Sequence, residues 1–164
     1  RGGVDRRTAA RPPPGPIPSN YVVMVDAKHL KQVNYFEGNT AVGDAYLKAV
    51  AEVIGNQAKE VGFTSKLQGT RYLIGMREAS PEAVARFQTN VATALANDEN
   101  VKRVFANQQK FLDDKIATTK GKEKEEWKEK LKILVKPEFG VANTPLKPGD
   151  DLQQVIKGLE EATK

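Results

Sequence analysis

The residues best suited to chemistry in this sequence follow its first strongly apolar run. Asp26 closes the run 21–25, and a carboxylate after a buried strand lies at the sheet edge where α/β proteins keep functional groups. His29 is the single histidine of the chain, and there is no cysteine. Because metal sites need several convergent ligands, a site built on histidine or thiolate ligands is not expected.

The charge of the chain bears on its partners. Lysine and arginine outnumber aspartate and glutamate by 26 to 21, which leaves a net charge of +5. Many lysines fall within 115–136, where glutamates alternate with them, and such a mixed-sign run is typical of a solvated helix face. No nucleic-acid partner is therefore expected, since nucleic-acid binding needs clustered basic residues without acidic neighbours. The alternative is base stacking on Phe63 and Tyr72 of neighbouring strands.

The start of the chain differs in composition from the rest. Residues 1–19 contain five prolines and three glycines, which preclude a regular element and indicate a flexible linker. A proline-rich docking peptide is the sharper alternative. No apolar run is long enough to span a bilayer, so no membrane contact by this segment is expected. Residues 20–164 are predicted to form one domain.

Hydrophobic periodicity predicts the elements of this domain. The predicted strands are 21–26, 63–67, 71–76, 131–136 and 139–142, of which 63–67 and 71–76 form a hairpin. The predicted helices are 43–59, one beginning after the N-cap Ser80, 101–116, a charged one ending near Trp127, and a last one from Asp150. Residues 27–42 are predicted as a connection. This order indicates an α+β fold with a ferredoxin-like βαββαβ core and a helical insertion over about 99–130.

Three stretches of the domain share the order of a known set of motifs. Residues 25–34 read VDAKHLKQVN, residues 38–47 read GNTAVGDAYL, and residues 66–72 read KLQGTRY. They resemble D-x-D-x-F-K-x-I-N, G-H-x-x-G-D-x-x-L and R-x-G-G-D-E-F of the GGDEF domain of bacterial diguanylate cyclases. The third stretch lies in the predicted hairpin, as it does in the family. Weaker echoes of the family are EFGVA at 138–142 and GVDRR at 3–7.

The resemblance implies an enzyme that joins two GTP molecules into cyclic di-GMP with magnesium. In the family one metal-binding carboxylate ends the first strand and another lies in the hairpin. Asp26 matches the first. The signature positions are degenerate here and carry Gln68, Gly69, Thr70, Arg71 and Tyr72.

The two acidic signature positions decide the expectation about catalysis. Thr70 and Arg71 replace them with a neutral residue and a cation, and Lys28 replaces the second aspartate of D-x-D. Because Mg²⁺ needs carboxylate oxygens, no magnesium and no other cofactor are expected. Gln68 replaces the first of two glycines that let the backbone approach phosphate, and only Gly69 remains. The chain is therefore expected to be a pseudo-enzyme without catalytic residues.

The guanine-binding end of the family site is better kept. The resemblance assigns Asn34 and Asp44 to the guanine base and Lys31 to phosphate, which makes them, with Asp26, remnant nucleotide-binding residues. The structural alternative is that Asn34 is a turn residue and Asp44 a helix N-terminal acid. The family's inhibitory product site, R-x-x-D, falls on Lys59 to Gly62 and is expected to be lost. Lysine lacks arginine's planar fork, and Gly62 has no side chain.

Several functions remain open from the sequence. The first is a catalytically inactive regulatory or protein-interaction module in bacterial cyclic di-GMP-related signalling, whose partners are other proteins or other domains of the same chain. The second is a non-catalytic sensor of GTP or cyclic di-GMP that binds guanine nucleotide weakly. The third is a residual cyclase in which Glu37 replaces a lost acid. The resemblance implies a cytoplasmic setting, and Trp127 is expected to anchor its helix rather than bind a ligand.

Overall fold

A computed structural model describes residues 19–37, 40–67, 69–134 and 136–164, and of residues 36 and 37 the backbone alone. The elements, in chain order, are β1 (Ser19–Ala27), α1 (Leu30–Glu37), α2 (Ala41–Ala58), β2 (Gly62–Lys66), β3 (Arg71–Arg77), α3 (Pro81–Asn97), α4 (Glu99–Thr118), α5 (Gly121–Lys132), β4 (Phe139–Pro145) and α6 (Leu152–Ala162). The predicted linker, apart from Ser19, lies outside the described residues.

The four strands form one antiparallel sheet in the order β2-β3-β1-β4. This is the strand order of a ferredoxin-like βαββαβ core, so the predicted fold class is confirmed. The central strand β1 has neighbours on both sides, which explains its continuous apolar sequence. Asp26, near its end, is opposite Arg71 of β3 and Gly140 of β4.

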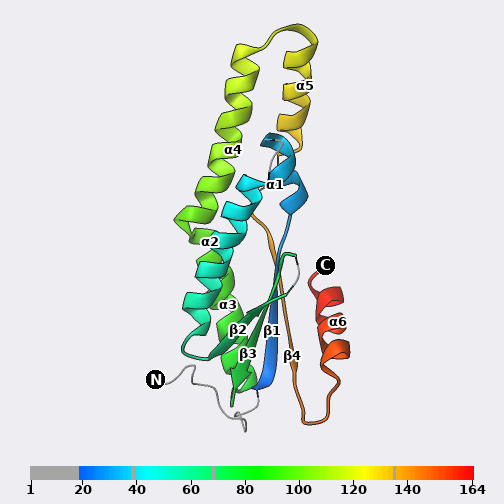
Figure 1. Ribbon diagram of the computed structural model, residues 1–164. Helices are drawn as coiled ribbons and strands as arrows, with labels where there is room; N and C mark the ends of the chain where they lie inside the picture. The colour runs from blue at the N-terminus through cyan, green and yellow to red at the C-terminus, as the bar shows by residue number, and fades with distance from the viewer. Residues whose placement is uncertain (1–18, 38–39, 68, 135) are drawn as a thin grey trace.

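The two faces of the sheet are covered unequally (Figure 1). Helices α2 and α3 cover one face, where Val23 and Val25 of β1 belong to the main core. On the other face Val22 and Met24 form a smaller cluster with Leu159 of α6. The larger core contains the predicted stripes of both covering helices: Tyr46, Val50, Val53 and Ile54 of α2, and Val84, Phe87, Val91 and Leu95 of α3. Ser80 caps α3 by accepting a hydrogen bond from the Ala83 amide at 3.1 Å, as predicted.

The insertion is a helical hairpin of α4 and α5 that extends beyond the sheet (Figure 1). The first part of α4 packs on the body through Val101, Val104 and Phe105 of the main core, and Gln108 donates to the Val33 carbonyl of α1. In contrast, no residue of α5 is buried. Its half-buried Trp127 packs edge-on against Phe111 of α4, with ring centroids 5.7 Å apart, and therefore anchors the helix as predicted.

Three predicted elements were wrong. The described residues of 131–136 are not a strand, because α5 continues to Lys132 rather than ending near Trp127, and turn hydrogen bonds follow it at Ile133 and Leu134. The place beside β1 is taken by β4, so the alternating apolar residues of this stretch have no strand to pair with, and Ile133 stays 53% exposed. The predicted connection 27–42 contains the short helix α1, whose residue Val33 is buried in the main core.

Within the described part of the chain, no helix is both long enough and apolar enough to cross a membrane.

Candidate functional site

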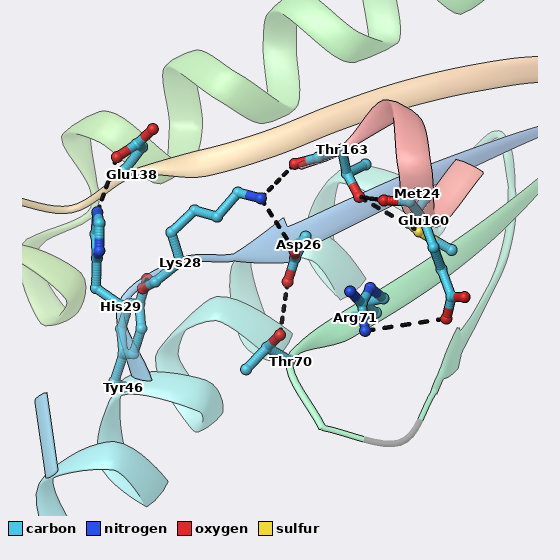
Figure 2. Close-up of polar contacts among 10 residues, drawn as sticks. All are labelled: Met24, Asp26, Lys28, His29, Tyr46, Thr70, Arg71, Glu138, Glu160 and Thr163. Carbon is cyan, nitrogen blue, oxygen red and sulfur yellow. Dashed lines mark hydrogen bonds and ion pairs between the residues drawn. The ribbon is translucent and has the colours of Figure 1, made fainter. Parts of the chain in front are cut away.

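Asp26 is the centre of a polar cluster at the end of β1. It is 6% exposed, which makes it one of the few buried polar residues in the described chain. The Thr70 hydroxyl donates to its Oδ1 at 2.6 Å, and the Lys28 ammonium lies 3.2 Å from its Oδ2 (Figure 2). A buried carboxylate needs such partners, because an unpaired buried charge is strongly unfavourable. Both oxygens of Asp26 are therefore engaged by residues of this chain.

The hairpin between β2 and β3 holds Thr70 in place. The Ala27 amide donates to the Thr70 carbonyl at 3.0 Å, which joins the hairpin to the end of β1. Gly69 has a φ of +82°, a left-handed conformation that favours glycine, and its carbonyl accepts from Lys66 Nζ at 2.9 Å. The prediction for Gln68 concerns a residue outside the described part of the chain.

The last two signature positions have structural partners. Tyr72 is 1% exposed, and its hydroxyl donates to the Leu47 carbonyl at 3.0 Å; burial raises its pKa. Tyr72 therefore belongs to the core and offers no stacking surface. Arg71 forms an ion pair with Glu160 of α6, with 3.9 Å between Nη1 and Oε2. Its Nε is buried without a hydrogen-bond partner among the described residues.

The C-terminal end of α6 closes over this cluster (Figure 2). Besides its contact with Asp26, the Lys28 ammonium donates to the backbone carbonyl of Thr163, the C-cap residue of α6. Gly140 of β4 lies so close to this carbonyl that a Cβ there would overlap it. Glu160 and Thr163 were not predicted to belong to this cluster, because nothing in the sequence pairs them with residues about a hundred positions earlier.

Around His29 the structure shows a second set of contacts. His29 has a φ of +71°, Nε2 lies 2.8 Å from Glu138 Oε1, and Nδ1 lies 3.3 Å from Gln32 Oε1. These contacts tie the segment before β4 to the start of α1. In the described chain, no group of three or more histidine, aspartate or glutamate side chains is placed to hold a metal.

Tyr46 was predicted only as a core residue, but it also contacts the backbone of the Asp26 cluster. Its hydroxyl donates to the Lys28 carbonyl at 3.0 Å, and its ring packs edge-on against Phe105 at 5.3 Å. Burial, followed by the charge of Asp26, raises the pKa of Tyr46 well above its usual range, so the hydroxyl remains a donor.

The predicted guanine end forms where α1 meets α2. Asn34 Oδ1 accepts a hydrogen bond from the Gly43 amide at 3.0 Å, and Asp44 follows Gly43 in the first turn of α2. A Cβ at Gly43 would overlap the Asn34 side chain, which explains the glycine. Asp44 is exposed, and Lys31 is exposed one turn before Asn34 on α1. Asp44 is the helix N-terminal acid that the structural alternative predicted. Asn34, however, lies within α1 and is not the turn residue that this alternative predicted.

The positions of the family's inhibitory site lie on β2 and the end of α2. Lys59 is the exposed C-cap of α2. Gly62 begins β2 so close to the Gly75 carbonyl of β3 that no side chain would fit there. The glycine therefore has a packing reason of its own, whichever ligand the family binds at this position.

Comparison with known proteins supports the fold. No family model and no curated protein matches the sequence. Among solved structures, the chain is similar to the diguanylate cyclase SiaD from Pseudomonas aeruginosa, solved in complex with its activator SiaC. The TM-score is 0.58 at 16% identity, over 88% of this chain and 45% of that chain.

Two further structures are similar. The active GGEEF domain of a diguanylate cyclase from Vibrio cholerae has a TM-score of 0.57 at 12% identity, over 87% of this chain and 72% of that chain. The GGDEF domain of DgcB from Caulobacter crescentus, in complex with c-di-GMP, has a TM-score of 0.51 at 16% identity, over 89% of this chain and 70% of that chain. These likenesses show that the chain has the fold of GGDEF domains, as the sequence predicted. The chain spans less than half the length of the SiaD chain.

Proposed function

We propose that this domain is a catalytically inactive GGDEF-like domain that acts as a regulatory or protein-interaction module in bacterial, cytoplasmic cyclic di-GMP-related signalling. The observation that carries the proposal is that both carboxylate oxygens of Asp26 have partners within the chain. Its two oxygens are bound by Thr70 and Lys28, so the carboxylate that the family uses for magnesium serves here as an internal acceptor.

The charges around Asp26 support the same conclusion. Lys28 and Arg71 both lie beside it, at positions where the family resemblance places acids. A divalent cation is neutralised by carboxylates and repelled by ammonium and guanidinium groups, so this cluster disfavours Mg²⁺. Because phosphoryl-type transfer depends on such a metal, the cluster lacks what would stabilise charge developing on phosphate oxygens.

A role in protein interaction is supported by the helical hairpin. Helix α5 has no buried residue and presents most of its charged side chains to solvent. The SiaD structure contains a protein activator, which shows that one protein with this fold has such a partner. Exposed helical faces are a common means of recognising other proteins. The partner is therefore proposed to be another protein or another domain of the same chain.

The test of inactivity is a product assay. The purified domain is incubated with GTP and either Mg²⁺ or Mn²⁺, beside an active diguanylate cyclase, and cyclic di-GMP is measured by chromatography. We expect product only from the active enzyme. Product from this domain that Asp26→Asn abolishes would contradict the proposal. The residual-cyclase alternative predicts that result, and its substitute acid, Glu37, has a side chain outside the described part of the chain.

A guanine-nucleotide sensor is the second candidate function. The observation that favours it is the contact of Asn34 with the Gly43 amide, next in the chain to the exposed Asp44. Isothermal titration with GTP, with and without Mg²⁺, and with cyclic di-GMP distinguishes the two candidates. Absence of heat in a folded sample supports the interaction module. Binding that Asp44→Asn weakens, with Glu52→Gln on the same helix as control, supports the sensor.

A further inference from the structure

Strand β4 lies at one edge of the sheet, and only its inner side is paired, with β1, in the described part of the chain. At the start of this pairing the Lys28 amide donates to the Glu138 carbonyl at 3.0 Å, and at its end the Leu146 amide donates to the Asn20 carbonyl at 2.8 Å. Because the backbone groups of an antiparallel strand alternate in direction, the even-numbered residues of β4 bond β1. The residues whose N–H and C=O groups point away from the sheet are therefore Phe139, Val141 and Asn143.

The two edges of the sheet differ in how they are protected. An exposed strand edge is a template for pairing with another chain, and proteins commonly block it with charged side chains or keep the strand short. At one edge, β2 has five residues and ends in Lys66. At the other edge, β4 has seven residues, FGVANTP, and carries no charge. Strand β4 is therefore the edge that is open to another strand.

Prolines bracket the donors of this open edge. Pro145 ends β4, and Pro137 lies just before the strand begins. Both have the same parity as the outward residues, and neither has an N–H to donate. They lie equally far from Val141 in the sequence. The part of the edge that can donate hydrogen bonds is thus symmetrical about Val141.

A symmetrical edge complements itself when a second copy runs antiparallel to it. With Val141 opposite Val141 of the second copy, Phe139 is opposite Asn143, and each outward N–H meets an outward C=O. The positions without an N–H, Pro137 and Pro145, then fall opposite each other. Because β4 is uncharged, this pairing brings no like charges of the strand together. The symmetry of the donors favours a second copy of the chain over an unrelated peptide.

We propose that β4 is the edge through which two copies of this chain pair, and that they form a two-fold dimer with one continuous sheet centred on Val141. Two-fold dimers in which both copies use the same surface are the commonest oligomers. The dimer is weak, because it depends on a small number of backbone hydrogen bonds at an edge that water also reaches. The inference goes beyond the proposed function and needs neither a nucleotide nor another protein.

This pairing also positions the α4–α5 hairpins. Strand β4 begins at the end of the sheet beyond which the hairpin extends (Figure 1). Because the two β4 strands run in opposite directions, the hairpins of the dimer extend from opposite ends of the shared sheet. A dimer of this kind presents its charged helices to two partner molecules at once.

The first test is sedimentation equilibrium of the whole chain between about 10 µM and about 1 mM, the range of weak association. The apparent mass is expected to rise from 18.0 kDa toward twice that value. Val141→Pro removes the central outward N–H without removing a bond to β1, so it should weaken dimerisation more than about tenfold. Val141→Thr keeps the N–H and the branched shape, and should change the dimerisation Kd by less than about twofold. Circular dichroism and thermal melting check that each variant is folded.

A second pair of variants tests the register without proline. In the proposed register Thr144 lies opposite Glu138 of the second copy, and Glu138 is 66% exposed beside His29. Thr144→Lys should therefore tighten the dimer about threefold, and Thr144→Glu should weaken it about threefold. The same two substitutions at the exposed Thr64 of β2 are the controls and should leave the dimer unchanged.

Three results would overturn the proposal. The first is a folded chain that stays monomeric throughout this concentration range, including one whose β4 edge instead captures a different protein in a complex that Val141→Pro disrupts. The second is a dimer that a folded Val141→Pro variant leaves intact. The third is an equal effect of Thr144→Lys and Thr144→Glu, which contradicts the register. None of these measurements involves nucleotide, so the inactivity proposal stands or falls separately.

Discussion

The two ends of the candidate site use their polar residues in opposite ways. At the signature end, Asp26 is buried, and its contacts run to Thr70 and Lys28 and onward to α6. At the guanine end, Lys31 and Asp44 are exposed, and only Asn34 has a defined internal role. The contrast teaches that the residues at the signature end are built into the fold, while Lys31 and Asp44, predicted to bind nucleotide, face solvent.

The largest expected effect is a loss of unfolding free energy when a lysine at the signature end is replaced by methionine. Lys28→Met leaves the buried Asp26 carboxylate without its cation and also releases Thr163. Because the Lys28 side chain is 21% exposed, we expect a loss of about 2 kcal/mol in unfolding free energy, less than the removal of one partner from a fully buried pair. Urea denaturation measures this loss.

Lys31→Met is the matched control at the guanine end. Its exposed ammonium should contribute less than about 0.5 kcal/mol. The double variant Lys28→Met with Asp26→Asn should recover part of the lost stability, because the unpaired charge is then gone. Equal losses from Lys28→Met and Lys31→Met would remove the distinction between the ends.

The next effect concerns the uncharged signature residue. Thr70→Val keeps the shape of the side chain but removes the hydroxyl that donates to Asp26 at 2.6 Å. A buried acceptor left without its donor costs about 1–3 kcal/mol, and we expect about 1.5 because Lys28 remains. Thr64→Val, at an exposed position on β2, is the control. A thermal melt in which both variants behave alike would show that Thr70 does not hold Asp26.

At the guanine end, Asn34 separates a structural role from a binding role. Asn34→Ala removes the acceptor for the Gly43 amide and should cost about 1 kcal/mol. Asn34→Asp keeps an acceptor oxygen and should retain most of the stability. If the side-chain amide also binds guanine, Asn34→Asp would still change nucleotide binding while remaining as stable as the wild type in the melt.

The smallest effect is expected at the exposed acid of the same end. Asp44→Asn removes a negative charge from the first turn of α2, where it interacts favourably with the helix dipole. The expected loss is about 0.3 kcal/mol, measurable as a small shift in the urea midpoint. A loss above about 1 kcal/mol would mean that Asp44 has a structural partner that its exposure does not suggest.

Local patterns were sufficient for much of the fold. The continuous apolar run of β1, the hairpin of β2 and β3, and the stripes of α2 and α3 were all visible as periodicity. The prediction of a strand at 131–136 was wrong for a tertiary reason. The apolar residues do alternate there, but β4 occupies the position beside β1. The short helix α1 was missed, because a few apolar residues give little period to detect.

By itself the sequence determined that Thr70, Arg71 and Lys28 stand where its resemblance to GGDEF domains leads one to expect acids. Only the tertiary structure decided what these residues do instead. Thr70 and Lys28 bind Asp26, and Arg71 turns to Glu160 of α6, a helix about ninety positions away. The physical reason is that a sequence states which charges exist, whereas burial and chain packing decide which of them meet.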